Sequence, residues 1–144
     1  MQTLWLSRLA LVLIAAHRHP IHAARVELDV TPSGTINATV HVYRDDLPAG
    51  ADIANVEAAL DRGIVLSDAH GVRVSLRVIT VVSEGDRMRI ALGGTARGGV
   101  AHGTIAVPLL QDRFSDQVNV VQVTLPRGHA QLVFLRGDRP QVLP

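Results

Sequence analysis

The chain has 144 residues, of which 47% are hydrophobic and 19% are charged, and its formal net charge is +1. This size and this mixture are typical of one globular domain. All 14 basic residues are arginine and cysteine is absent, which excludes a lysine nucleophile, disulfides, thiol catalysis and zinc sites built on thiolates.

The first sixteen residues, 1–16, are predicted to be a secretory signal peptide. A short segment that carries Arg8 is followed by eight consecutive apolar residues ending in two alanines, the arrangement of a cleaved export signal. A membrane-spanning helix needs about 20 apolar residues, so we expect no permanent membrane anchor. Cleavage after Ala16 is favoured, with cleavage after Ala23 or Ala24 as the alternatives. Residues 17–144 are then expected to form a single exported β-sandwich-like domain, located in the periplasm or outside the cell.

Removal of residues 1–16 changes the charge and the aromatic content of the chain. It leaves 13 arginines against 13 acidic residues, a formal charge of zero, which does not favour a nucleic-acid partner. It also removes Trp5, so that Tyr43, Phe114 and Phe134 are the only aromatic residues that remain. Stacking platforms for bases or sugars are therefore scarce.

Two alternating segments at the start of the mature chain predict a β-hairpin. Every second residue is apolar in 26–30 and in 36–42, and the turn sequence 31–34 lies between them, as expected for two half-buried strands. Because apolar side chains must face apolar side chains, the register is fixed. The predicted pairs are Val30 with Ile36, Leu28 with Ala38, and Val26 with Val40.

One helix and a series of short strands are expected after this hairpin. The apolar spacing over 52–62, with Asp52 at the start and Gly63 at the end, is typical of a short helix. Valine-rich runs between turn residues predict strands near 64–66, 72–82, 87–92, 100–107, 118–125 and 130–135, with a helical turn near 109–114. We therefore predict a mostly β fold, an antiparallel β-sandwich that is immunoglobulin-like in general architecture, with one short helix after the second strand.

Three histidines at the predicted mature N-terminus form the densest group of candidate metal ligands: His17, His19 and His22. After cleavage at Ala16, His19 would be the third residue, and its imidazole, two backbone amides and the terminal amine could coordinate copper or nickel in a square plane. His17 could instead chelate a metal through its amine and its ring. A polar leader to the first strand, without a metal, is the alternative.

The hairpin register brings a second group of polar residues to this place. Continuing the same pairing sets His22 opposite Arg44, Ile21 opposite Asp45, and Pro20 opposite Asp46. Imidazoles beside the carboxylates of Asp45 and Asp46 would suit zinc, copper or another divalent ion. The alternative is that these two aspartates close the strand and accept hydrogen bonds from backbone amides of the next turn.

The remaining polar motif precedes the predicted strand at 118–125. Gln117 and Asn119 are candidate binding residues there, and turn hydrogen bonding is the alternative. The sequence contains no Gly-x-Ser-x-Gly, no His-Glu-x-x-His and no glycine-rich phosphate loop after a strand. These absences do not favour an enzyme.

Several of these motifs occur in one order that resembles a family of small exported bacterial proteins, the domain-of-unknown-function family 6702. The motifs are His19-Pro20-Ile21-His22, Tyr43-Arg44-Asp45-Asp46-Leu47, Glu84-Gly85-Asp86 and Phe114-Ser115-Asp116-Gln117-Val118-Asn119. The resemblance implies export and a mostly β domain. It singles out His19, His22, Asp45, Asp46, Gln117 and Asn119 without implying a reaction.

Two functions from different classes follow from the sequence. The first is a non-catalytic exported domain that binds an envelope or secreted protein through a sheet face or a sheet edge. The second is a periplasmic protein that binds copper, nickel or zinc through the N-terminal histidines and the Asp45–Asp46 segment.

Overall fold

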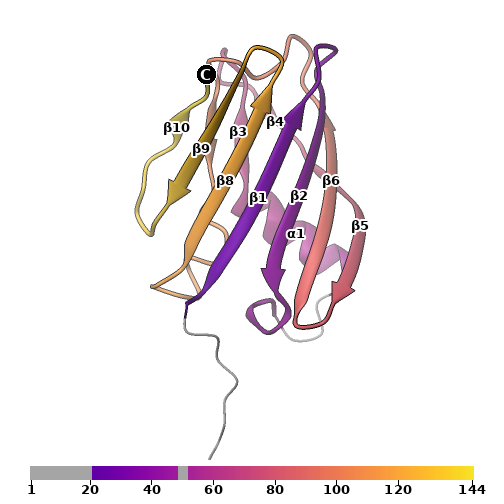
Figure 1. Cartoon of the computed structure of the whole chain (residues 1–144), viewed down its shortest axis with the longest axis vertical. Helices are drawn as coiled ribbons and strands as arrows, with labels where there is room; N and C mark the ends of the chain where they lie inside the picture. Colours follow the sequence, from indigo (N-terminus) through magenta and orange to yellow (C-terminus); the bar gives the residue numbers. More distant parts are fainter. Residues whose placement is uncertain (1–20, 49–51) are drawn as a thin grey trace, which may run out of the picture.

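The computed structural model describes residues 21–48 and 52–144 (Figure 1). The fold is mostly β, with one short α-helix after the second strand. The elements in chain order are β1 (Ala23–Val30), β2 (Thr35–Tyr43), the 3-10 turn η1 (Arg44–Asp46), α1 (Ile53–Gly63), β3 (Val65–Ser67), β4 (Arg73–Val74), β5 (Arg77–Glu84), β6 (Arg87–Thr95), β7 (Thr104–Ala106), β8 (Val118–Leu125), β9 (Gly128–Phe134) and β10 (Gln141–Val142).

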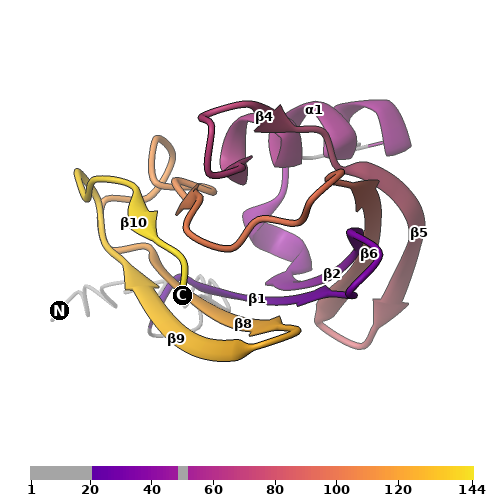
Figure 2. The same cartoon turned by 90° about the horizontal axis from the view of Figure 1, so that it is seen from above.

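The strands form two open sheets in a sandwich-like arrangement. The larger sheet has the strand order β5-β6-β2-β1-β8-β9, and the smaller sheet has the order β10-β7-β3-β4. Viewed from above, the larger sheet curves beneath the smaller one, and α1 lies on the same side as the smaller sheet (Figure 2). The hydrophobic core fills the space between these layers, with Val26, Val40 and Ile90 from the larger sheet and Leu66 and Ile105 from the smaller sheet all fully buried.

The predicted register of the first hairpin is confirmed. Val30 pairs with Ile36, Leu28 with Ala38, and Val26 with Val40. The expectation of a wholly antiparallel sandwich is wrong at one place, because β1 and β8 are parallel neighbours, with Ala23 beside Val118. The larger sheet is therefore mixed, and the strand that opens the described chain lies near its centre (Figure 1).

The single strand predicted over 72–82 is also wrong, because this segment belongs to both sheets. β4 pairs with β3 in the smaller sheet, whereas β5 pairs with β6 in the larger one. The connection between them passes over Gly94, where an added Cβ would lie only 2.6 Å from the Ser75 carbonyl oxygen. A glycine at this point allows the close backbone approach. β6 itself continues to Thr95, beyond the strand predicted over 87–92.

One other predicted strand is shorter than expected, and the predicted helical turn is confirmed. The strand predicted over 100–107 is limited to β7, because 100–103 form turns in which the Gly103 amide donates to the Val100 carbonyl. The helical turn near 109–114 is confirmed by a bond from the Phe114 amide to the Leu110 carbonyl, 2.9 Å long.

The predicted helix is confirmed as α1, with Asp52 as its N-cap. The Asp52 side chain accepts a hydrogen bond of 2.8 Å from the Asn55 amide, which satisfies one of the free donors of the first turn. Val56 and Leu60 are buried in the core. No helix within 21–48 or 52–144 is both long enough and apolar enough to cross a membrane.

Candidate functional site

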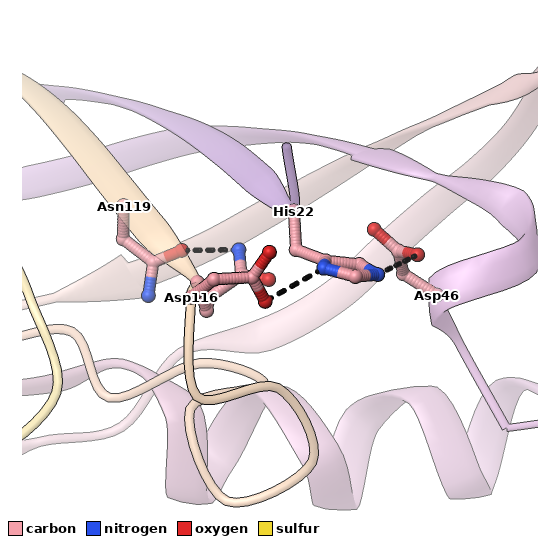
Figure 3. Close-up of polar contacts among 5 residues, drawn as sticks. His22, Asp46, Asp116 and Asn119 are labelled. Carbon is pink, nitrogen blue, oxygen red and sulfur yellow. Dashed lines mark hydrogen bonds and ion pairs between the residues drawn. The ribbon is translucent and has the colours of Figure 1, made fainter. Parts of the chain in front are cut away.

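A polar cluster around His22 lies at one end of the larger sheet, where β1 begins (Figure 3). The His22 ring lies between two carboxylates from separate segments. Its Nδ1 donates a hydrogen bond of 2.8 Å to Asp116 Oδ1, and its Nε2 lies 3.9 Å from Asp46 Oδ1. The side chain of His22 is only 17% exposed, so its ring is largely fixed by these neighbours.

An aromatic ring covers one face of the imidazole. The rings of His22 and Phe114 are stacked, with centroids 3.9 Å apart and an angle of 8° between their planes. The guanidinium carbon of Arg113 lies 5.4 Å from the centre of the same phenyl ring, within the range of a cation–π interaction. The His22 carbonyl also accepts from the Val118 amide at 2.9 Å. Together these contacts join the start of β1 to the segment before β8.

The hydrogen bond from His22 lowers the pKa of the Asp116 carboxyl below its ordinary value of 3.8. The cause is direct stabilisation of the ionised carboxylate by the donated hydrogen bond, to which the nearby imidazole adds a smaller electrostatic effect. Asp116 is therefore a carboxylate over the ordinary pH range and acts as a hydrogen-bond acceptor for the ring.

Gln117 and Asn119 lie next to this cluster but face the interior of the protein. Asn119 Nδ2 donates to the carbonyl oxygens of Val107 and Leu109, at 2.8 and 2.9 Å. Asn119 Oδ1 accepts a bond of 2.8 Å from Gln117 Nε2. Both side chains are almost fully buried, and these bonds attach the segment after β7 to the start of β8. Ligand binding by Gln117 and Asn119 stays a prediction.

The predicted metal ligands are brought together only in part. His17 and His19 lie outside the described residues. His22 and Asp46 are neighbours, although the predicted register set Pro20 opposite Asp46. Asp45 is exposed at the surface. The separations around His22 are those of hydrogen bonds and ion pairs, longer than the roughly 2 Å of metal coordination. Across 21–48 and 52–144, no group of three or more His, Cys, Asp or Glu side chains is arranged to hold a metal ion.

The route by which Asp46 reaches His22 differs from the predicted one. The β1–β2 ladder ends with Arg25 opposite His41, so the predicted continuation to His22 opposite Arg44 is wrong. The chain turns instead at η1, where the Arg44 amide donates to the Asp86 carbonyl at 2.9 Å. This turn buries Asp46 beside the imidazole.

Two residues of the His22 cluster, Phe114 and Asp116, were missed by sequence reasoning. No local pattern links them to His22. The signal that would have found them is the parallel pairing of β1 with β8, because Ala23 beside Val118 places the residues preceding each strand together.

Among residues 21–48 and 52–144, the two edge strands of the larger sheet are β5 and β9. On β9, the outward carbonyl of Val133 is already occupied, because it accepts a bond of 3.0 Å from Gln141 Nε2. On β5, the apolar side chains of Ile79 and Val82 are exposed, Ile79 to 63%. The register of β5 shifts between Val78 and Thr80, which is a β-bulge of the kind often found at sheet edges.

No protein-family model matches the chain, and no curated protein matches it.

Proposed function

We propose that this protein is an exported, non-catalytic interaction domain that binds an extended segment of an envelope or secreted protein along the edge of β5. The observation that carries the proposal is the eight-residue edge strand β5 with exposed apolar side chains. An edge strand offers a row of main-chain donors and acceptors to an added strand. Export, an immunoglobulin-like architecture and membership of the domain-of-unknown-function family 6702 are parts of the same proposal.

The part of β5 after the bulge is the best-formed template for an added strand. From Thr80 to Glu84 the pairing with β6 is regular, and it ends at a two-residue turn in which Gly85 has φ +65°. The pair that closes such a turn is hydrogen-bonded, and hydrogen-bonded pairs alternate with non-hydrogen-bonded ones along an antiparallel ladder. By this alternation Val81 and Ser83 turn their amides and carbonyls outward, where a partner strand would meet them.

The opposite edge is a poorer template. The side chain of Gln141, which belongs to β10 of the smaller sheet, caps the Val133 carbonyl. Side-chain caps of this kind protect an edge against strand addition. We therefore place the added strand of the partner along β5.

The test is selection of random ten-residue peptides displayed on phage against the protein exported from its own signal. We expect enriched peptides with alternating apolar residues, and we expect them to slow hydrogen exchange at the amides of Val81 and Ser83. Ser83→Pro removes one outward donor while the preceding residue keeps its extended backbone. It should weaken peptide binding by about tenfold, the equivalent of a lost interstrand bond of about 1.4 kcal/mol.

The matched control is Ser83→Ala, which keeps the backbone amide and should bind the same peptides as the wild type. Circular dichroism establishes that both variants are folded. Equal binding by Ser83→Pro, slowed exchange at some other surface, or the absence of any enriched peptide would each overturn the proposal.

A metal-binding function is the second candidate, and the 3.9 Å approach of His22 to Asp46 favours it. The remaining ligands would come from His17 and His19, with copper, nickel or zinc as the ion. Native mass spectrometry of the exported protein, after exposure to the three ions, should then show one retained ion that the double variant His19→Ala/His22→Ala loses. A spectrum without a retained ion refutes this candidate and leaves the edge-binding proposal intact.

A further inference from the structure

A pocket of about 420 Å³ lies between the C-terminal end of α1, the loop after β7 and the residues after β9. Its volume falls within the usual range of small-molecule sites, roughly 300 to 1,000 Å³. It is separate from the edge strand β5, and it adjoins the His22 cluster through Arg113, whose guanidinium lies over the Phe114 ring. Its lining combines two kinds of surface, one cationic and one apolar.

The cationic part consists of three arginines from separate segments of the chain. Arg62 comes from the last turn of α1, Arg113 from the loop before β8, and Arg136 from the residues after β9. Asp112 is the one acidic residue in the lining. None of the three arginines forms an ion pair with another residue in the described part of the chain. The pocket therefore has an excess of uncompensated positive charge.

Acidic residues of α1 do not neutralise this charge, because they are paired elsewhere. Asp61 Oδ1 lies 3.3 Å from the Arg73 guanidinium, and Glu57 Oε1 lies 2.5 Å from Nε of Arg77. Arg73 lies in β4 and Arg77 in β5, and neither arginine lines the pocket. The acidic side chains of α1 are thus paired away from Arg62, and Asp112 is the acidic residue that lines the pocket with it.

The apolar part is the loop that follows β7, where Pro108, Leu109 and Leu110 line the pocket. Leu110 has φ +61°, a left-handed conformation that is rare for a residue other than glycine and that often occurs at binding sites. The neighbouring side chain of Gln111 is buried and donates to the Phe134 carbonyl at 3.2 Å. The loop is therefore held in its shape before any ligand arrives.

We propose that this pocket binds an organic anion in which a carboxylate is attached to an apolar chain. A guanidinium group is planar and binds a carboxylate through two parallel hydrogen bonds. Pro48, Ala59 and Pro108, which line the same pocket and are exposed or half-buried, provide the surface on which the apolar chain of the ligand is removed from water. The same chemistry is found in a free carboxylic acid and in the C-terminal residue of a polypeptide, and the probes below separate the two.

The test uses four probes and two-dimensional NMR of the ¹⁵N-labelled full chain. Hexanoate and hexan-1-ol differ only in the charged head, as do N-acetyl-leucine and N-acetyl-leucinamide. We expect each anion to shift the amide signals of Leu109, Leu110 and Gln111, and to bind about tenfold more tightly than its neutral counterpart. Stronger binding of hexanoate indicates a free acid as the ligand class, and stronger binding of N-acetyl-leucine indicates a polypeptide C-terminus.

Single variants test the arginines themselves. Arg62→Gln, Arg113→Gln and Arg136→Gln should each weaken binding of the preferred anion about fivefold, as expected for one partly exposed ion pair of about 1 kcal/mol. Arg97→Gln is the control, since Arg97 is exposed outside the pocket lining, and it should bind like the wild type. Equal binding of anions and neutral analogues, or unchanged binding in all three variants, would overturn the proposal. Neither result would bear on the proposed strand addition at β5.

Discussion

Substitution of Asn119 by alanine is expected to lower the free energy of unfolding by about 3 kcal/mol. Asn119 is fully buried, donates to the carbonyls of Val107 and Leu109, and accepts from Gln117. Truncation leaves three buried polar groups without this partner, and each such group costs about 1 to 3 kcal/mol. Even the lower value, summed over three groups, is a large part of the roughly 5 to 15 kcal/mol that stabilises a typical domain.

The measurement is urea unfolding followed by far-UV circular dichroism. Asn37→Ala is the matched control, because Asn37 is an exposed asparagine in β2, and its substitution should change stability by no more than about 0.5 kcal/mol. Asn119→Asp keeps the side-chain volume but removes both donors, and it should be at least as destabilising as Asn119→Ala. The reasoning would be refuted if both Asn119 variants lowered the free energy of unfolding by less than about 1 kcal/mol while the slope of that free energy against urea concentration stayed unchanged.

Two further predictions concern the His22 cluster and one turn. Since the folded-state pKa of Asp116 is lowered, its contribution to stability is complete above pH 3.8 and is lost as the pH falls through the lowered pKa. In His22→Leu, which removes the donor, the titration of the Asp116 carboxyl carbon, followed by NMR, should move up toward 3.8, and an unchanged midpoint would contradict the assigned cause. Gly34 has φ +84°, and an added Cβ would overlap the Ala96 carbonyl oxygen, whereas Gly85 has φ +65° with open space around it. Thermal unfolding should therefore show that Gly34→Ala lowers the free energy of unfolding by at least about 3 kcal/mol and Gly85→Ala by about 1 kcal/mol. Equal decreases in the two variants would show that the contact with Ala96 is unimportant.

The parts of the fold that depend on local pattern could be predicted from the sequence. Alternation of apolar residues gave the register of the first hairpin, since a slip by one residue would expose its whole apolar face. The N-cap Asp52 and the apolar spacing behind it gave α1. The segment 72–82 was misjudged because a valine-rich run carries no mark of the point where the chain changes from one sheet to the other.

In the candidate sites too, proximity within a hairpin could be predicted from the sequence, whereas contacts between distant segments could not. The hairpin predicted that the segments containing His22 and Asp46 would lie close together, but the contact between these two residues depends on the turn η1, which the register did not predict. The contacts of His22 with Phe114 and Asp116 could not, because they depend on the parallel pairing of β1 with β8. The three-arginine pocket was missed for a similar reason, since its arginines come from segments that are distant along the chain and meet only in the folded structure.

The parallel pairing of β1 with β8 also sets the order in which the protein can form during synthesis. β2 follows β1 directly and can pair with it at once, but the other neighbour of β1 is complete only when Leu125 has left the ribosome. Until then one edge of an apolar strand has no partner, which makes a shortened chain prone to aggregate. Fragments that end before β8 should therefore be insoluble, and the sheet closes only in a nearly full-length chain.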